Sequence, residues 1–329
     1  MIYKLFFYLR ENGISATLGR ITFKLLSRLN SPGELLRPSL KQRNRYINLR
    51  KVILFQRKKN ALSRFISLDQ TQKEQIDSDQ GFLKIDPKFF KQDLHELGRS
   101  LYSQFNIKQR LENIGKDNSE YKNISAERTP IITIEAKDIN KNQHLLKFLT
   151  NKNLITVIAN YLKIMPWLYS ADIWISHATD TVPSSSQNFH MDWEDHRIIK
   201  LFLFLDEITD EHGPLSFVNA NNSKKVINYY KERYERNLVS ERLTDEQVYE
   251  VVDRSDLISL TGPRYTTGLV DTCNVLHYGS RPSKYPRIML SCMFASPFSI
   301  QNYIWQRTRF SSEVLTDNIS EPWSWVIKH

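Results

Sequence analysis

The sequence predicts a mainly β domain with flanking helices, of the barrel or jelly-roll type. Short apolar segments separated by turn signals dominate the second half of the chain, and this spacing favours such folds over a parallel α/β sheet. Hydrophobic residues make up 40% of the 329-residue chain and aromatic residues 12%, enough to fill a core. The expected strands are 82–85, 131–134, 169–176, 198–205, 215–219, 267–271, 275–277 and 287–294.

Residues 1–74 are expected to form a basic, partly helical N-terminal arm. Residues 1–60 contain 14 Lys or Arg and two acidic residues, a balance of +12. Since the whole chain carries +10, the remainder carries −2. Within 18–29, apolar residues at helical spacing lie on one face and Arg20, Lys24 and Arg28 on another. Such a helix suits either an anionic membrane surface or packing on the main domain with its charges solvated.

A second basic stretch, residues 41–64, has the charge to contact phosphate groups of lipid or nucleic acid. It lacks a nucleic-acid-binding motif and an aromatic stacking platform. We therefore expect a solvated basic face there and no nucleic-acid partner. The polar residues 69–80 are interpreted as a linker.

The chain has no apolar run near the roughly 18 residues of a membrane span. It also shows no signal-peptide pattern, and two cysteines give no disulfide framework. These features predict a cytoplasmic protein in a reducing compartment. Peripheral contact with the inner membrane face through residues 1–64 is the open alternative.

The main domain is expected to span 75–300. Helices are predicted at 89–105, 144–149 and 154–162, with a polar loop at 108–129. A charged helical insertion near 221–256 interrupts the strand pattern, and it is either a substrate-selecting element or a plain surface hairpin. The tail, 301–329, contains Trp305, Trp323 and Trp325. We expect these to pack on the core or on a partner subunit, with a membrane-interface role as an alternative.

The candidate chemistry centres on the triplet His190-Met191-Asp192. In an extended chain the side chains of His190 and Asp192 point to the same face, so both can bind one metal ion. A third ligand is expected from His277, at the end of a short apolar segment. Two histidines and one carboxylate on one side of a metal form the facial triad of non-haem Fe(II) oxygenases.

Arg287 begins the strand after His277 and is the candidate carboxylate binder. Alternation places Arg287, Met289, Ser291 and Met293 on one face and Ile288, Leu290 and Cys292 on the other. A buried Arg on an apolar strand needs an anionic partner, and its guanidinium binds carboxylate through two parallel hydrogen bonds.

These motifs in this order resemble the phytanoyl-CoA dioxygenase family of Fe(II)/2-oxoglutarate oxygenases. The resemblance rests on the H-x-D triplet, the segment LDEITDEHGPLSFV at 205–218, and the distal His277 with Arg287 downstream. Weaker similarity at 80–85 and 153–162 extends it to roughly residues 75–297. The resemblance implies a double-stranded β-helix (jelly roll, cupin-like) core with Fe(II) and 2-oxoglutarate as cofactors. It also implies His190, Asp192 and His277 as iron ligands and Arg287 as the 2-oxoglutarate binder.

Further candidates surround this set. Lys200 shares a face with Phe202 and Phe204, so it points into the cavity or lies at its edge. The side chains expected to flank the cofactor are Lys200, Gln187 and His177. Those expected near the substrate are Trp193, Glu194 and Arg281, where Arg281 faces either solvent or substrate.

The sequence departs from the family pattern at two places. The family often has a Pro-Gly-Ser-His-like turn after the segment that ends at Val218, whereas this chain continues with 219–224, NANNSK. A small hydroxyl residue often stands two positions after the distal histidine, whereas here Gly279 occupies that position and Ser280 follows. Neither departure removes a metal ligand, but both leave the details of cofactor binding open.

The function that we expect is Fe(II)/2-oxoglutarate-dependent hydroxylation of an unactivated C–H bond in a small-molecule, lipid or sugar substrate. Two other classes stay open. One is a non-catalytic β-barrel module that binds metal or ligand without 2-oxoglutarate turnover. The other is a binder of anionic surfaces through the basic arm, with salt-dependent binding. The sequence does not indicate an oligomeric state.

Overall fold

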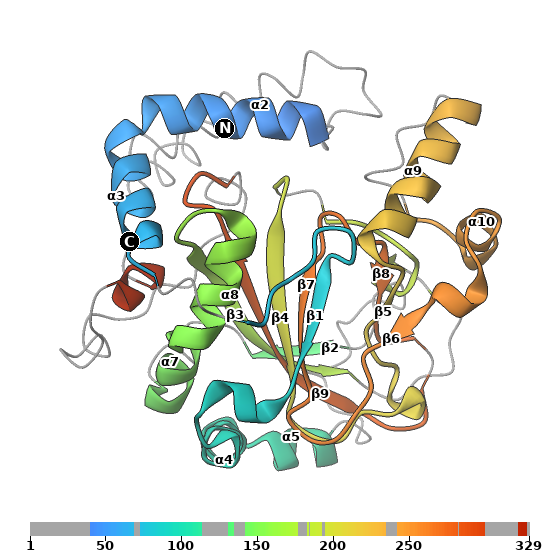
Figure 1. The fold of residues 1–329 in the computed structure, drawn as a ribbon. Helices are drawn as coiled ribbons and strands as arrows, with labels where there is room; N and C mark the ends of the chain where they lie inside the picture. Colours follow the sequence, from blue (N-terminus) through green and yellow to red (C-terminus); the bar gives the residue numbers. More distant parts are fainter. Residues whose placement is uncertain are drawn as a thin grey trace, which may run out of the picture.

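The structure, a computed structural model of the chain, describes residues 40–68, 73–113, 131–134, 142–176, 183, 185–192, 195–234, 242–281, 283–299 and 322–327. Its centre is a pair of antiparallel sheets of unequal size (Figure 1). Helices α7 and α8 cover one face of the larger sheet, and the smaller sheet lies against the other face.

The larger sheet has six strands in the order β1-β7-β4-β9-β3-β2, and every neighbouring pair is antiparallel. The strands are β1 (Phe82–Ile85), β7 (Thr267–Asp271), β4 (Ile198–Phe204), β9 (Arg287–Ala295), β3 (Trp167–Ser176) and β2 (Ile131–Ile134). The smaller sheet has the order β6-β5-β8, with β6 (Ile258–Ser259), β5 (Ser216–Phe217) and β8 (His277–Tyr278).

Alternation along the strands separates two buried layers. On β4, Leu201 and Leu203 face the helices, whereas Phe202 and Phe204 face the smaller sheet and pack in one cluster with Phe217. On β9, Ile288, Leu290 and Cys292 belong to the helix-facing layer and Met289 to the inner layer. The expected division of faces on β4 and β9 is therefore confirmed, and it directs Lys200 and Arg287 into the space between the sheets.

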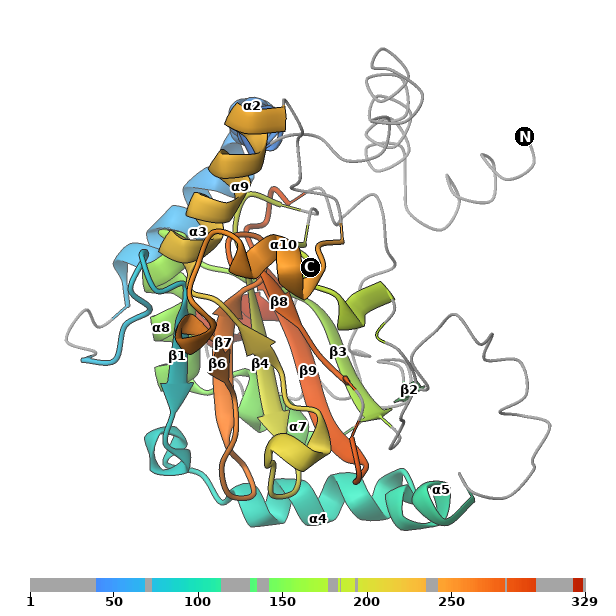
Figure 2. The same cartoon turned by 90° about the vertical axis from the view of Figure 1, so that its right-hand side faces the viewer.

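The helix layer rests on α4 (Leu94–Gln104), α7 (Gln143–Leu149) and α8 (Lys152–Leu162). Each begins at a polar cap, because the side chains of Asp93, Asn142 and Asn151 accept hydrogen bonds from backbone amides of the first turn. Figure 2 shows α4 and α5 (Ile107–Asn113) running beneath the ends of the strands.

Local backbone geometry corrects two expectations. The helix expected over 89–105 is divided, because Pro87–Phe90 forms a separate 3-10 turn that ends at Lys91 in the left-handed conformation (φ 48°). The Asp93 cap then starts α4. The loop expected over 108–129 begins as the helix α5, and the described part ends at residue 113.

The segment expected as a helical insertion contains α9 (Ala220–Tyr234) and α10 (Asp245–Tyr249). These helices pack against the H-x-D segment, because Val226, Tyr230 and Val248 share one buried cluster with Phe189 and Met191. The backbones of Phe189 and Leu243 exchange two hydrogen bonds of 3.1 and 2.8 Å. The insertion therefore supports the segment that carries His190.

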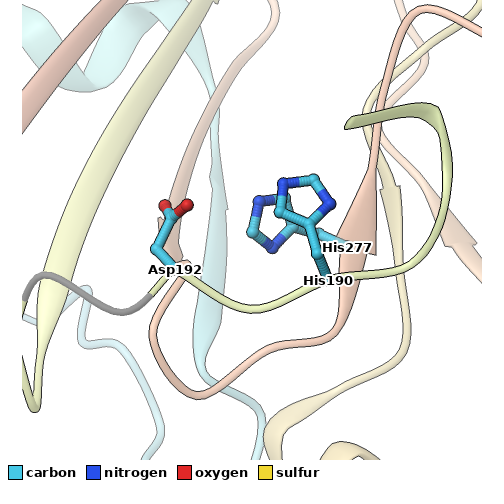
Figure 3. Close-up of side chains that lie close together, drawn as sticks. All are labelled: His190, Asp192 and His277. Atoms are coloured by element: carbon cyan, nitrogen blue, oxygen red, sulfur yellow. The ribbon is translucent and has the colours of Figure 1, made fainter. Parts of the chain in front are cut away.

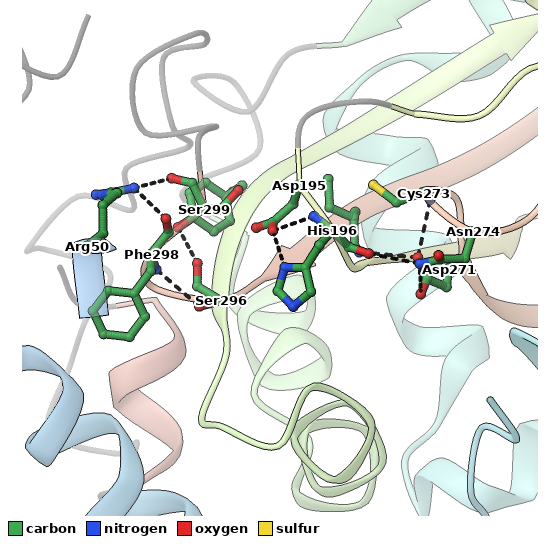
Figure 4. A network of polar contacts seen from close by, with 11 residues as sticks. Arg50, Asp195, His196, Asp271, Cys273, Asn274, Ser296, Phe298 and Ser299 are labelled. Atoms are coloured by element: carbon green, nitrogen blue, oxygen red, sulfur yellow. Dashed lines mark hydrogen bonds and ion pairs between the residues drawn. The ribbon is translucent and has the colours of Figure 1, made fainter. Parts of the chain in front are cut away.

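Helices α2 (Leu40–Ile53) and α3 (Phe55–Ile66) form an angled pair on the main domain. Ile47 and Ala61 are fully buried with Phe298, and Arg50, only 6% exposed, donates to the carbonyls of Phe298 and Ser299 at 2.5 Å each (Figure 4). Arg50 is therefore an exception to the solvated basic face expected over 41–64. The amphipathic stretch 18–29 lies outside the described residues.

In the tail, the 3-10 turn η6 (Trp323–Val326) packs on the core, and Trp325 lies 5.8 Å from Trp167 between ring centroids. Trp305 lies outside the described residues. Among the helices that the structure describes, none is both long and apolar enough to cross a membrane.

Arg50 provides a test of how α2 is held. We predict that Arg50→Gln lowers the free energy of unfolding by about 2–4 kcal/mol, because two buried carbonyls lose their donor. Arg45→Gln, on the exposed side of the same helix, should cost less than about 0.5 kcal/mol. Chemical denaturation measures both variants. Equal, small losses would show that Arg50 does not anchor α2.

Candidate metal centre

The site begins with a reciprocal pair of backbone hydrogen bonds between two distant segments. His190 N donates to His277 O at 3.0 Å, and His277 N donates to His190 O at 2.9 Å. In such an antiparallel pair the two side chains stand side by side on one face. The two imidazole centroids are 4.2 Å apart.

Each imidazole is fixed by a contact of the same kind, between its Nδ1 and a backbone carbonyl oxygen two residues earlier in the chain. His190 Nδ1 lies 2.9 Å from Asn188 O, and His277 Nδ1 lies 2.9 Å from Val275 O. A carbonyl only accepts, so each Nδ1 carries the proton and donates it. Each Nε2 is left with a lone pair, which is the form of histidine that binds metals.

Asp192 completes the cluster. Its backbone N donates to Thr272 O at 2.7 Å, which aligns the H-x-D segment with the turn before β8. His190, Asp192 and His277 each offer one potential ligand atom, and these three atoms all lie within 4.8 Å of one another. Figure 3 shows the carboxylate facing the two imidazoles. Within the described ranges, this is the one group of three or more such side chains with metal-binding spacing.

The charges also suit a divalent cation. Burial lowers the pKa of His277 below its ordinary value, and burial together with the neighbouring His277 lowers the pKa of His190 well below it. Burial by itself raises the pKa of Asp192, but the charge of Lys200 and the two histidines outweigh it, so that pKa lies below its usual range. At neutral pH the site therefore presents two neutral imidazoles and one carboxylate.

Lys200 contacts a candidate ligand. Its Nζ lies 2.6 Å from Asp192 Oδ2, and both side chains are largely buried. The structure thus places Lys200 at the metal cluster as the ion-pair partner of Asp192. Its expected contact with a cofactor stays a prediction.

Arg287 contacts the segment that follows His277 and lies in a pocket of neutral acceptors. Its guanidinium donates to Gly213 O at 2.6 Å, to Ser176 Oγ at 3.3 Å and to Ser280 Oγ. A Cβ placed on Gly279, two residues after His277, would lie 3.5 Å from Arg287 Nη1. Burial lowers the pKa of Arg287 to about 10, so it stays charged at neutral pH.

A buried cation ordinarily has an anionic partner, because removing a charge from water is costly. Arg287 is 3% exposed, and in the described part of the chain no carboxylate pairs with it. The two serine hydroxyls and one carbonyl around it are neutral. The described contacts of Arg287 are therefore all with neutral acceptors.

Sequence reasoning did not assign Ser176 or Ser280. The hydroxyl expected two positions after His277 is supplied one position later, because Ser280 adopts a left-handed conformation (φ 54°) that turns its Oγ toward Arg287. Ser176 lies opposite Arg287 in the β3–β9 register, and its Oγ is 2.9 Å from Ser280 Oγ. Ser176 could have been predicted only from the pairing register of β3 and β9, which places it opposite Arg287.

The other predicted residues have different surroundings. Gln187 is buried and its Nε2 donates to Ser280 O, so it supports the loop beside Arg287. Arg281 is partly exposed. It pairs with Asp245 at 2.5 and 2.9 Å, and its guanidinium lies 3.3 Å from the Tyr278 ring centroid. His177, Trp193 and Glu194 lie outside the described residues.

A buried carboxylate that the sequence did not single out holds the turn after β7. Asp271 accepts hydrogen bonds from Tyr161 Oη at 2.7 Å and Asn274 Nδ2 at 2.8 Å, and from the backbone of Cys273 at 3.2 Å (Figure 4). Burial raises its pKa. The same turn contains Thr272, whose carbonyl binds the Asp192 amide. Asp271 therefore orders the backbone behind the cluster.

A cavity of about 690 Å³ lies elsewhere, between α4, α5 and the loop before β7. Its lining includes Arg99, Tyr102 and Arg264 but no member of the metal cluster. It plays no part in the site described above.

No model of a known protein family matches the chain, and no curated protein matches it. Among solved structures, EctD from S. alaskensis with 2-oxoglutarate and 5-hydroxyectoine is 14% identical, covering 71% of this chain and 80% of EctD, with a TM-score of 0.45. AviO1 from Streptomyces viridochromogenes is 12% identical over 73% of this chain and 95% of its own (TM-score 0.41).

SnoN, the non-heme alpha ketoglutarate dependent epimerase from nogalamycin biosynthesis, is 10% identical over 72% of this chain and 82% of its own (TM-score 0.42). At these identities and scores the likeness assigns neither a family nor an activity to this chain.

The geometry predicts one divalent metal ion per chain. We expect His190→Ala and His277→Ala each to weaken Co(II) or Mn(II) binding by about 100-fold or more, because each removes one of three protein ligands. Because burial lowers the pKa of both imidazoles, protons should compete with the metal only below pH ~6.5. Isothermal titration between pH 8 and 5.5 measures both effects.

The matched control is His144→Ala, a histidine on α7 outside the cluster, which should leave metal affinity unchanged. If all three variants bound metal equally well, the site would lie elsewhere.

Proposed function

We propose that this protein is an Fe(II)/2-oxoglutarate-dependent dioxygenase that hydroxylates an unactivated C–H bond of a small-molecule, lipid or sugar substrate. Its two sheets would form a double-stranded β-helix of the phytanoyl-CoA dioxygenase type. One observation carries the proposal. A metal-binding cluster of two histidines and one carboxylate is linked, through the segment from His277 to Ser280, to a buried arginine that has no carboxylate partner among the described residues.

The ligand set suits iron and leaves room for chemistry. Two imidazoles and one carboxylate from one side leave coordination positions open for other molecules, as in non-haem Fe(II) oxygenases. Catalytic zinc sites also use two histidines and a carboxylate. The ligand set by itself therefore does not separate an oxygenase from a hydrolase, and the discrimination comes from Arg287.

Arg287 favours a dicarboxylate cosubstrate. 2-Oxoglutarate has a second carboxylate at some distance from its metal-binding end, and a buried cation is a suitable partner for that carboxylate. The guanidinium of Arg287 and the hydroxyls of Ser176 and Ser280 offer a cationic fork with additional donors for that carboxylate. The charge and the donors around Arg287 thus suit the cosubstrate that the iron would need.

The chain's own residues have distinct tasks in this account. The Nε2 atoms of His190 and His277 and the carboxylate of Asp192 would hold the iron. Arg287 would orient 2-oxoglutarate. The apolar side chains on the inner layer, including Phe202, Phe204 and Met289, keep water from the space between the sheets.

Bound iron with 2-oxoglutarate and O2 supplies the oxidation: the substrate C–H becomes C–OH, and 2-oxoglutarate becomes succinate and CO2. One oxygen atom of O2 enters the product and the other enters succinate, so the equation balances without a further reductant.

A metal-binding module without catalysis is the second candidate, and it predicts metal binding with no 2-oxoglutarate turnover. The Arg287 pocket argues against it, because a cation kept buried without a described anionic partner costs stability and has no use in simple metal binding. Succinate formation in the presence of Fe(II) and O2 separates the two candidates.

The test of the cosubstrate site compares two arginines. In metal-loaded protein without O2, we predict that Arg287→Met weakens 2-oxoglutarate binding by about 100-fold and Arg287→Lys by about tenfold, because Lys keeps the charge but loses the fork. Isothermal titration gives the affinities.

Arg281→Met is the control, since Arg281 is already paired with Asp245 and should change the affinity less than about threefold. The opposite order, with Arg281 essential and Arg287 dispensable, would contradict the assignment.

A further inference from the structure

An exposed apolar corner lies where α2 meets α3. Four large apolar side chains within seven positions are exposed there: Leu49 (57%), Val52 (73%), Ile53 (69%) and Phe55 (66%). In the described residues only three other large apolar side chains are comparably exposed, and they are separate from this corner in sequence (Ile66, Tyr234 and Tyr285). A gathered set of this kind marks an interaction surface, whereas isolated exposed residues do not.

The corner is held from behind. Ile47 and Ala61 are buried against the main domain, and Arg50 donates to the Phe298 and Ser299 carbonyls (Figure 4). Farther along α3, the Arg64 guanidinium lies 4.5 Å from the Trp325 ring centroid. The inward faces of both helices are therefore occupied, and the apolar side chains point away from the domain. Figure 1 shows the α2–α3 junction at the edge of the molecule.

Basic residues adjoin the apolar ones on the same helix faces. Arg45 precedes Leu49 by one helical turn on α2, and Lys58 and Lys59 follow Phe55 by one turn on α3. Arg45 and Lys59 are exposed. From residue 40 to residue 68 the chain has nine Lys or Arg and no acidic residue. The surface thus combines protruding apolar side chains with a surrounding rim of basic side chains, Arg45, Lys58 and Lys59.

We propose that the α2–α3 corner docks on an anionic lipid bilayer surface. Leu49, Val52, Ile53 and Phe55 enter the interfacial region, and Arg45, Lys58 and Lys59 lie at the level of the acidic headgroups. The charge argues for this occupant. A second copy of the chain would bring the same basic rim against itself, and like charges repel.

The size of the corner argues in the same direction. Stable protein interfaces bury roughly 800 Å² on each partner, spread over some 20–30 residues. Four side chains at a convex helix junction offer much less contact area than that. A lipid surface needs no matching shape, and a few inserted apolar side chains with nearby cations suffice for reversible binding.

The experiment is vesicle flotation with the full chain. Vesicles are made of phosphatidylcholine alone or with about 30% phosphatidylserine, a content that gives a negative surface. The wild type should bind the anionic vesicles at least about tenfold better than the neutral ones, and 0.5 M salt should reduce that binding. The corner variant Val52→Ser/Ile53→Ser/Phe55→Ser should lose at least about tenfold of the wild-type binding.

Ile66→Ser is the matched control, because Ile66 is 76% exposed but lies at the far end of α3, and it should bind as the wild type does. All substituted side chains are exposed, so circular dichroism and the thermal midpoint should stay unchanged.

Equal binding of the corner variant and the wild type overturns the proposal, as it would if another segment of the chain covered the corner. A wild-type dimer that the corner variant breaks, detected by light scattering, also overturns it and assigns the corner to a second copy. The vesicle assay contains no iron or 2-oxoglutarate, so its outcome is independent of the proposed activity.

Discussion

The site depends on the two backbone hydrogen bonds between His190 and His277. They join a segment that precedes β4 to the beginning of β8, and they set two imidazoles 4.2 Å apart before any ion is considered. The Nδ1 contacts to Asn188 O and Val275 O then fix the orientation and tautomer of each ring. Because backbone atoms supply these restraints, the site is preorganised by the fold and not by flexible side chains. The neighbouring buried cluster of α9 and α10 and the Asp271 turn support the same backbone from two sides.

The site also contains buried charges. Burial lowers the pKa of Arg287, so its charged form opposes folding, and the low pKa of both histidines means that the fold resists protonating them. Such features are ordinary where a protein must bind ions and unusual in a purely structural core. Lys200 adds a cation close to the carboxylate that would hold the metal. A divalent ion bound by Asp192 would change the balance of charge around this carboxylate, and Lys200 pairs with that carboxylate directly.

Features that depend on alternation along a single strand could be predicted from the sequence. Alternation along β4 and β9 predicted which side chains share a face with Lys200 and with Arg287, and the spacing of His190 and Asp192 predicted that both lie on one side of an extended segment. What could not be predicted depends on geometry between distant segments. Ser176 lies near Arg287 because the β3–β9 register pairs the two residues. Ser280 lies near Arg287 because its backbone adopts a left-handed conformation. The docking of Arg50 and the pairing of Arg281 with Asp245 are likewise tertiary contacts that no local pattern encodes.

The central claim is that His190, Asp192 and His277 hold iron with open positions that 2-oxoglutarate can occupy. The most direct measurement is the visible spectrum of Fe(II)-loaded protein when 2-oxoglutarate is added without O2. We expect a metal-to-ligand charge-transfer band in the wild type and its loss in His277→Ala. A folded, iron-loaded wild type that shows no band would show that 2-oxoglutarate does not bind iron at this site.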